Sequence, residues 1–125
     1  MTCVLIVDDS PTETYKMENI LKKNGFEVAK AENGTEGVAT ARRVLPDLVL
    51  MDVVMPGLNG FQATRQLTKT QQTSHIPVII VTTKDQPTDK LWGKRQGAKG
   101  YLVKPVDEKE LISSVKRVLA GEELI

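Results

Sequence analysis

Four short runs of apolar residues constrain the fold of this chain most strongly. They occupy residues 4–7, 48–51, 78–81 and 101–103, and every position in them is apolar. Uninterrupted apolar runs of this length are typical of strands that are buried on both faces in the centre of a parallel sheet. A fifth run, residues 27–31, mixes polar and apolar residues, which indicates a strand at the edge of the sheet.

Helical patterns lie between these runs. Ser10, Pro11 and Glu13 form a helix-start signal, and Gly25 is a natural helix end. Four further helical patterns begin near Asn33, Phe61, Pro87 and Asp107, and end near Pro46, Leu67, Gly97 and Gly121. Alternating strands and helices predict an α/β fold. We expect a doubly wound, flavodoxin-like (βα)5 domain with a five-stranded parallel sheet and helices on both faces.

Composition excludes several classes of protein. The 125 residues suffice for one domain, and the net charge of +1 does not favour sequence-independent binding of nucleic acid. The single cysteine, Cys3, excludes an intrachain disulfide and a cysteine zinc cluster, and we expect it to be a buried apolar residue. No apolar run is long enough for a membrane helix, and no signal peptide pattern follows Met1. We therefore expect one cytoplasmic domain over residues 1–125.

Polar side chains follow the apolar runs at the point where each strand should end. Asp8 and Asp9 follow the first run, Asp52 the next central run, Thr82 the third and Lys104 the last. In an open α/β sheet, ligands bind outside the carboxyl ends of the strands. Taken singly, an aspartate at a strand end is most often a helix cap or a turn residue. The joint occurrence favours a shared site at one edge of the sheet.

This combination of side chains predicts a metal-dependent phosphoryl site. Three clustered carboxylates repel one another, and such clusters usually hold a hard divalent cation such as Mg²⁺ or Mn²⁺. A lysine and a threonine could neutralise the oxygens of a phosphoryl group, and a carboxylate could accept it. The pattern leaves open which aspartate attacks. We favour Asp52 because it stands alone after its strand, whereas Asp8 and Asp9 form a pair suited to holding metal.

The motifs resemble those of the receiver domain of two-component response regulators, the CheY-like family, over essentially the whole chain. The matching pieces are Asp8-Asp9, Met51-Asp52 followed by residues 55–60 (Met-Pro-Gly-Leu-Asn-Gly), residues 81–83, and residues 100–105. Their order and spacing make the resemblance specific. Residues 7–13, 54–67 and 91–98 further resemble single-domain receivers that regulate type IV pilus twitching motility.

The resemblance implies a role for each residue at the acidic site. Asp52 would accept a phosphoryl group from a CheA-like histidine kinase. Asp9, Asp52 and the backbone carbonyl of Val54 would ligate Mg²⁺, with Asp8 acting directly or through water. Lys104 would contact the acyl phosphate. The domain would be a phosphoacceptor in signalling, and any catalysis would be limited to its own phosphorylation and dephosphorylation.

The resemblance also implies how the signal leaves the domain. Thr82 would move to donate a hydrogen bond to the phosphoryl group, and Tyr101 would rotate inward, changing the surface formed by the fourth helix, fifth strand and fifth helix. A protein partner would bind there, in twitching or phototactic motility. We expect a monomer without an output domain, without nucleic-acid binding and without membrane insertion. Family members often have a cis peptide at Lys104-Pro105.

Other functions remain as alternatives. A phosphatase of the haloacid dehalogenase kind would need a second aspartate two residues after the nucleophile, where this chain has Val54. A flavin-binding protein would need a phosphate loop instead of Asp8-Asp9. A phosphorylation-independent pseudo-receiver, or a phosphate sink, remains open. We interpret Trp92 as a packing residue, with an anchor on the output surface as the alternative if it is partly exposed, and His75 as a non-catalytic loop residue.

Overall fold

The computed structural model describes residues 1–125 as five strands that alternate with five helices. The strands are β1 (Cys3–Val7), β2 (Glu27–Ala31), β3 (Leu48–Met51), β4 (Val78–Thr82) and β5 (Gly100–Val103). The helices are α1 (Pro11–Lys23), α2 (Gly34–Val44), α3 (Gly60–Lys69), α4 (Pro87–Arg95) and α5 (Glu108–Leu119). This order confirms the predicted (βα)5 domain.

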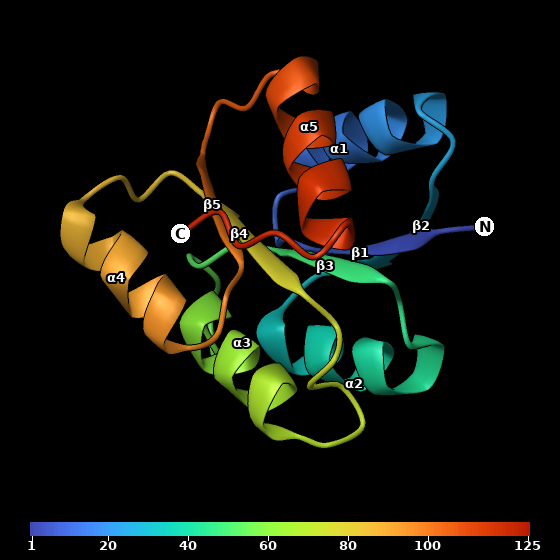
Figure 1. The fold of residues 1–125 in the computed structure, drawn as a ribbon. Helices are drawn as coiled ribbons and strands as arrows, with labels where there is room; N and C mark the ends of the chain where they lie inside the picture. The colour runs from blue at the N-terminus through green and yellow to red at the C-terminus, as the bar shows by residue number, and fades with distance from the viewer.

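The five strands form one parallel sheet in the order β2-β1-β3-β4-β5. Helices α1 and α5 cover one face, whereas α2, α3 and α4 cover the other (Figure 1). The strand with mixed polarity, β2, lies at an edge as predicted, and β1, β3 and β4 lie inside. The prediction that the apolar run 101–103 is a central strand is wrong, because β5 forms the other edge of the sheet. A parallel sheet with helices on both faces buries its central strands completely, which explains why their sequences are continuously apolar.

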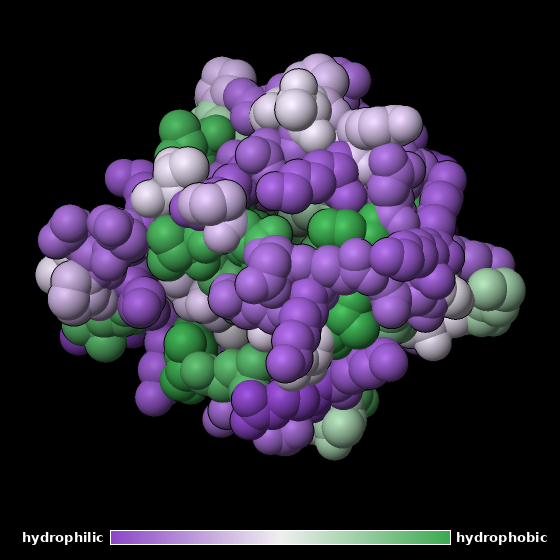
Figure 2. Space-filling model, turned by 90° about the horizontal axis from the view of Figure 1, so that it is seen from above, coloured by the Kyte–Doolittle hydropathy of each residue, from purple (hydrophilic) through white to green (hydrophobic).

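Two large apolar cores lie on either side of the sheet. Val4, Leu50 and Leu111 belong to the core under α1 and α5, whereas Leu5, Val49 and Leu67 belong to the core under α2 and α3. A smaller cluster lies under α4 and includes Ile80 and Tyr101. The surface seen from the side of α1 and α5 is mostly hydrophilic, with apolar residues in small separate groups (Figure 2). No helix is both long enough and apolar enough to span a bilayer.

Side-chain caps determine where most helices begin. Ser10, Asn33, Asn59 and Asp107 each accept a hydrogen bond from the backbone N–H three residues later, at 2.7–3.4 Å. Each cap satisfies a donor that the first helical turn leaves free. The C-terminal boundary of α2 is earlier than the predicted stop, because Leu45 adopts a left-handed φ of 51° before Pro46. The Lys104-Pro105 peptide is cis, as expected.

Helix α4 differs from the prediction. Trp92 and Leu91 are 52% and 49% exposed, so the interpretation of Trp92 as a packing residue is wrong. Gly93 is the buried residue of this helix, and an added Cβ there would contact the side chains of Ile80 and Tyr101. Because the helix meets the sheet through a residue without a side chain, its large apolar residues lie beside the contact rather than in it. Cys3 is also only partly buried.

Candidate functional site

Backbone hydrogen bonds bring the predicted site residues to one edge of the sheet. The N–H of Asp8 donates to Ala31, that of Asp52 donates to Val7, and that of Lys104 donates to Thr82, at 2.8–3.1 Å. Each of these bonds extends the pairing of two parallel strands by one residue. The three side chains therefore leave the carboxyl ends of β1, β3 and β5 at the same edge of the sheet, as the sequence predicted.

The three aspartates converge on one small region. One carboxylate oxygen from each of Asp8, Asp9 and Asp52 lies within 4.8 Å of the other two. Asp8 and Asp52 are buried, whereas Asp9 is exposed, so the cluster opens to solvent on one side. A set of carboxylate oxygens that is open to water suits Mg²⁺, which retains several of its own waters in proteins. The residues present therefore fit this ion.

Each buried carboxylate is oriented by backbone donors. Asp8 Oδ1 accepts from the N–H of Ser10 at 2.9 Å. Asp52 Oδ1 accepts from the N–H of Val53 at 2.8 Å and of Val54 at 3.4 Å. These bonds leave Asp52 Oδ2 directed toward Lys104, 3.7 Å from its Nζ. One oxygen of Asp52 is thus held by its own loop while the other faces the cation.

Lys104 supplies the positive charge of the site. Its Nζ lies 2.8 Å from Asp8 Oδ2, and both side chains are largely buried. Burial lowers the pKa of Lys104, but the hydrogen bond to Asp8 and the charge of Asp52 outweigh this effect and raise it above its usual value. The lysine therefore stays charged at neutral pH. The sequence did not predict the ion pair between Lys104 and Asp8, because the two residues are 96 positions apart.

The pKa of Asp52 is raised, and burial is the main cause. The nearby charge of Asp8 raises it further, whereas Lys104 and the hydroxyl of Thr82 lower it. Burial destabilises the ionised form of Asp52, and the charge of Lys104 stabilises it. A carboxylate whose pKa is perturbed in this way is a candidate for a reactive group rather than a purely structural one. Asp52 is 7% exposed, and the exposed Asp9 marks the side of the cluster from which a small reactant would approach it.

Thr82 and Tyr101 both contact the same residue of the β4–α4 loop. The hydroxyl of Thr82 accepts from the N–H of Lys84 at 3.4 Å, and the hydroxyl of Tyr101 donates to the carbonyl of Lys84 at 2.9 Å. Tyr101 is only 8% exposed as a residue, so in this conformation its side chain already lies inward. Burial, together with the charges of Asp89, Asp85 and Asp52, raises the pKa of Tyr101 to about 12.

Gly60 belongs to the matching motif of residues 55–60, but the sequence reasoning gave it no role at the site. Its N–H donates to the carbonyl of Val53, and an added Cβ would overlap the backbone carbonyl of Asp52. The loop after β3 can therefore fold against the start of α3 only if this residue lacks a side chain. The Asn-Gly pair that opens α3 was a signal for this close approach.

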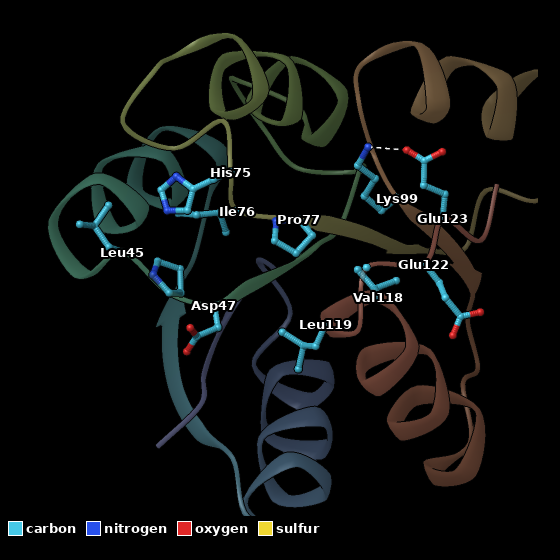
Figure 3. A pocket seen from close by; sticks show the side chains of 12 residues that line it. Leu45, Asp47, His75, Ile76, Pro77, Lys99, Val118, Leu119, Glu122 and Glu123 are labelled. Atoms are coloured by element: carbon cyan, nitrogen blue, oxygen red, sulfur yellow. Dashed lines mark hydrogen bonds and ion pairs between the residues drawn. The ribbon is translucent and has the colours of Figure 1, made fainter.

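A separate cavity of about 490 Å³ lies at the opposite, amino-terminal edge of the sheet. His75 lines this cavity together with Asp47 and Lys99 (Figure 3). None of the predicted site residues contributes to it. The structure thus places His75 away from the acidic cluster, as expected for a loop residue.

The chain resembles known proteins over nearly its whole length. Residues 4–116 match the family model of the response regulator receiver domain. The chain is 69% identical to Protein PilH of Pseudomonas aeruginosa over 121 residues, which cover 97% of this chain and all of that protein. It is 38% identical to the response regulator PleD of Caulobacter vibrioides over 113 residues, which cover 90% of this chain and 25% of that longer protein.

Solved structures agree with these matches. The chemotaxis protein CheY4 of Vibrio cholerae is 35% identical, with a TM-score of 0.89, and the match covers 94% of this chain and 98% of that one. A CheY-like receiver domain protein of Methanospirillum hungatei is 26% identical, with a TM-score of 0.90 and coverage of 97% and 95%. With its acidic cluster, buried lysine and (βα)5 sheet, the chain belongs to the family of response regulator receiver domains.

Proposed function

We propose that this protein is a stand-alone response regulator that accepts a phosphoryl group on Asp52. The observation that supports this assignment best is the convergence of Asp8, Asp9, Asp52 and Lys104 at the carboxyl edge of the sheet. Asp52 is the one aspartate of the cluster whose Oδ1 is held by two backbone donors of its own loop and whose Oδ2 faces the lysine.

In the proposed reaction, a carboxylate oxygen of Asp52 attacks the phosphorus of a phosphohistidine in a histidine kinase. The P–O bond forms, the P–N bond breaks, and the ring nitrogen of the histidine keeps the electron pair. Asp9, Asp52 and the carbonyl of Val54 would hold Mg²⁺, with Asp8 in direct or water-mediated contact. The ion would supply positive charge to the phosphoryl oxygens.

Lys104 is proposed to exchange partners during this step. In the unmodified site its Nζ lies closer to Asp8, at 2.8 Å, than to Asp52, at 3.7 Å. A phosphoryl group on Asp52 would bring new anionic oxygens within reach, and Thr82 would donate a hydrogen bond to one of them. Since both Thr82 and Tyr101 contact Lys84, movement of the threonine would be transmitted to the β4–α4 loop.

We propose that the protein acts in type IV pilus twitching motility or in phototactic motility, on the basis of its 69% identity to Protein PilH. A CheA-like histidine kinase would be the donor, and a protein partner would read the surface around α4, β5 and α5. We propose a cytoplasmic monomer. A phosphate sink would use the same chemistry without a downstream partner.

Intact mass spectrometry tests the proposal directly. The protein is incubated with acetyl phosphate and Mg²⁺, beside Asp52→Asn and beside a sample with EDTA. A phosphoryl adduct on the unmodified chain alone, lost with EDTA, is the expected result. No adduct would overturn the assignment and favour the pseudo-receiver alternative, whereas an adduct that persists in Asp52→Asn would overturn it by showing that another residue is the acceptor. Asp47→Asn, at the opposite edge of the sheet, should be phosphorylated normally.

A further inference from the structure

Charge is distributed very unevenly along this chain. Residues 53–106 contain eight lysines and arginines but only two acidic residues, Asp85 and Asp89. The remainder of the chain contains nine basic and fourteen acidic residues. Residues 53–106 form α3, β4, α4 and β5, so one side of a nearly neutral molecule is positively charged. Such a side attracts anionic partners and repels cationic ones.

The same side carries exposed apolar residues. Trp92 and Leu91 lie next to each other on α4 and are about half exposed. The guanidinium of Arg95 lies over the ring of Trp92, 5.7 Å from its centroid. A tryptophan beside arginine in an otherwise polar setting is the composition of a binding hot spot, because it offers large apolar area with a charged rim.

Trp92 lies on the flank of α4 that faces α3. Gln96, one turn after Trp92, accepts a hydrogen bond on its carbonyl from the hydroxyl of Thr68 in α3 at 2.7 Å. Residues one turn apart share a helix face, so Trp92 and Gln96 lie on the same side. Arg65, one turn before Thr68, is exposed on the facing side of α3. The apolar anchor is therefore flanked by cations from two helices.

The opposite flank of α4, toward β5, is partly covered by the chain itself. The N–H of Leu124 donates to the carbonyl of Lys99 at 2.7 Å, and Lys99 forms an ion pair with Glu123 at 2.6 Å (Figure 3). Ile125 packs against the cluster that contains Tyr101. Gly93 meets the sheet, and successive helix residues are about 100° apart, so Trp92 and Lys94 on either side of it lie on opposite flanks of α4. The C-terminal segment, residues 122–125, thus runs beside the edge strand (Figure 1).

We propose that the α3–α4 face, comprising Arg65, Leu91, Trp92 and Arg95, is a docking surface for an acidic protein segment with an apolar side. Apolar residues of the segment would cover Trp92 and Leu91, and its carboxylates would pair with Arg65 and Arg95. Residues 122–125 already lie along the β5 side of α4, so the α3–α4 face is a second surface, distinct from the α4, β5 and α5 surface proposed above for the partner that reads the switch. The proposal rests on the proposed function only in taking the output of the domain to be contact with a protein.

A synthetic peptide pair tests the proposal. One peptide carries leucines on one face and glutamates on the other, and its matched control has glutamine at every glutamate. Trp92 is the single tryptophan, so its fluorescence reports contact directly. We expect the acidic peptide to shift this fluorescence to shorter wavelength, to bind at least about tenfold more tightly than the control peptide, and to weaken as salt is added.

Variants locate the binding. Anisotropy of a labelled acidic peptide should show roughly tenfold weaker binding to Trp92→Ala and to Arg65→Glu. Lys116→Glu, the same charge reversal on α5, should bind normally, and Lys94→Glu should lose much less than Arg65→Glu. Equal losses in Lys94→Glu and Arg65→Glu would move the site to the β5 flank and overturn the proposal, as would equal binding of both peptides or binding of neither.

Other occupants of this face give distinct results. Concentration-dependent self-association that is lost in Trp92→Ala would show that a second copy occupies the face. Sedimentation with vesicles of anionic lipid, also lost in Trp92→Ala, would show that a membrane surface does. Either result without peptide binding overturns the proposal. All arms use both the untreated chain and Asp52→Asn, so a failure of phosphorylation leaves the docking result readable.

Discussion

At the scale of single residues, Asp52 shows how the site balances burial against charge. Its carboxylate is nearly enclosed and lies close to Asp8, and only Lys104 and a few hydrogen-bond donors compensate. The site therefore holds a group that the fold would be more stable without. A strained electrostatic arrangement of this kind is common where function, rather than stability, determines the residue.

Replacing this carboxylate should stabilise the fold. We expect Asp52→Asn to raise the free energy of unfolding at pH 7 by about 1 kcal/mol. The pKa of Asp52 is raised in the folded state. Its ionisation therefore does not lower the free energy of unfolding at a pH below the ordinary pKa of aspartate, and lowers it progressively as the pH rises from that value through the raised pKa. The gain should therefore disappear in acid. Urea unfolding at several pH values measures it, with exposed Asp85→Asn as a control that should change little.

Tyr101 gives a prediction on the alkaline side. Its pKa of about 12 implies that the phenol stays protonated until the solution is strongly basic. The stability from this group is complete below its ordinary pKa and is lost as the pH rises through about 12. An absorbance titration of Tyr101→Phe should lack this late ionisation. At neutral pH the variant should lose about 1 kcal/mol, because the hydrogen bond to Lys84 is gone.

At the scale of elements, the junction between β3 and α3 depends on one glycine. Gly60 starts α3 where the helix meets the backbone of Asp52, and its buried position leaves no room for a methyl group. Gly57, in the same loop, has open space around it but a φ of +75°. The two glycines are thus required for different physical reasons, close approach in one case and backbone conformation in the other.

This difference predicts unequal costs. Gly60→Ala should destabilise the protein by about 3 kcal/mol and slow phosphorylation by acetyl phosphate, because the Asp52 loop must shift. Gly57→Ala should cost only about 1 kcal/mol, from its positive φ alone, and should leave the modification rate nearly unchanged. Thermal unfolding and time-resolved mass spectrometry measure both. Equal effects of the two substitutions would contradict the role given to Gly60.

At the scale of the whole molecule, the acidic cluster links stability to metal. Asp8, Asp9 and Asp52 directly follow two adjacent strands, β1 and β3, and their repulsion acts between the carboxyl ends of these strands. An ion that binds only the folded cluster stabilises the entire domain by mass action. Metal binding at this small cluster therefore contributes to the free energy of unfolding of the whole domain.

Magnesium should therefore raise the stability of the protein measurably. At a concentration about 100-fold above its dissociation constant, Mg²⁺ should add about 2.7 kcal/mol to the free energy of unfolding. Asp9→Asn should reduce this gain strongly while it leaves the metal-free protein folded. Thermal melts with Mg²⁺, with EDTA and with NaCl at matched ionic strength distinguish binding from screening. A gain that NaCl reproduces would contradict a specific metal site.

The sequence alone determined the order of strands and helices and the set of side chains at the carboxyl edge. These features depend on local signals: apolar periodicity, caps such as Ser10 and Asp107, and the first polar residue after each strand. Parallel pairing then brings those residues together, so the sequence suffices to group Asp8, Asp52 and Lys104.

Only the tertiary structure decided which partners these residues have. The ion pair between Lys104 and Asp8, the inward position of Tyr101, and the overlap that an added side chain at Gly60 would cause all join segments that are distant in sequence. The choice between a packed and an exposed Trp92 was left open by the sequence for the same reason. Periodicity predicts that a helix has an apolar face, but the contact at Gly93 determines which side of α4 meets the sheet.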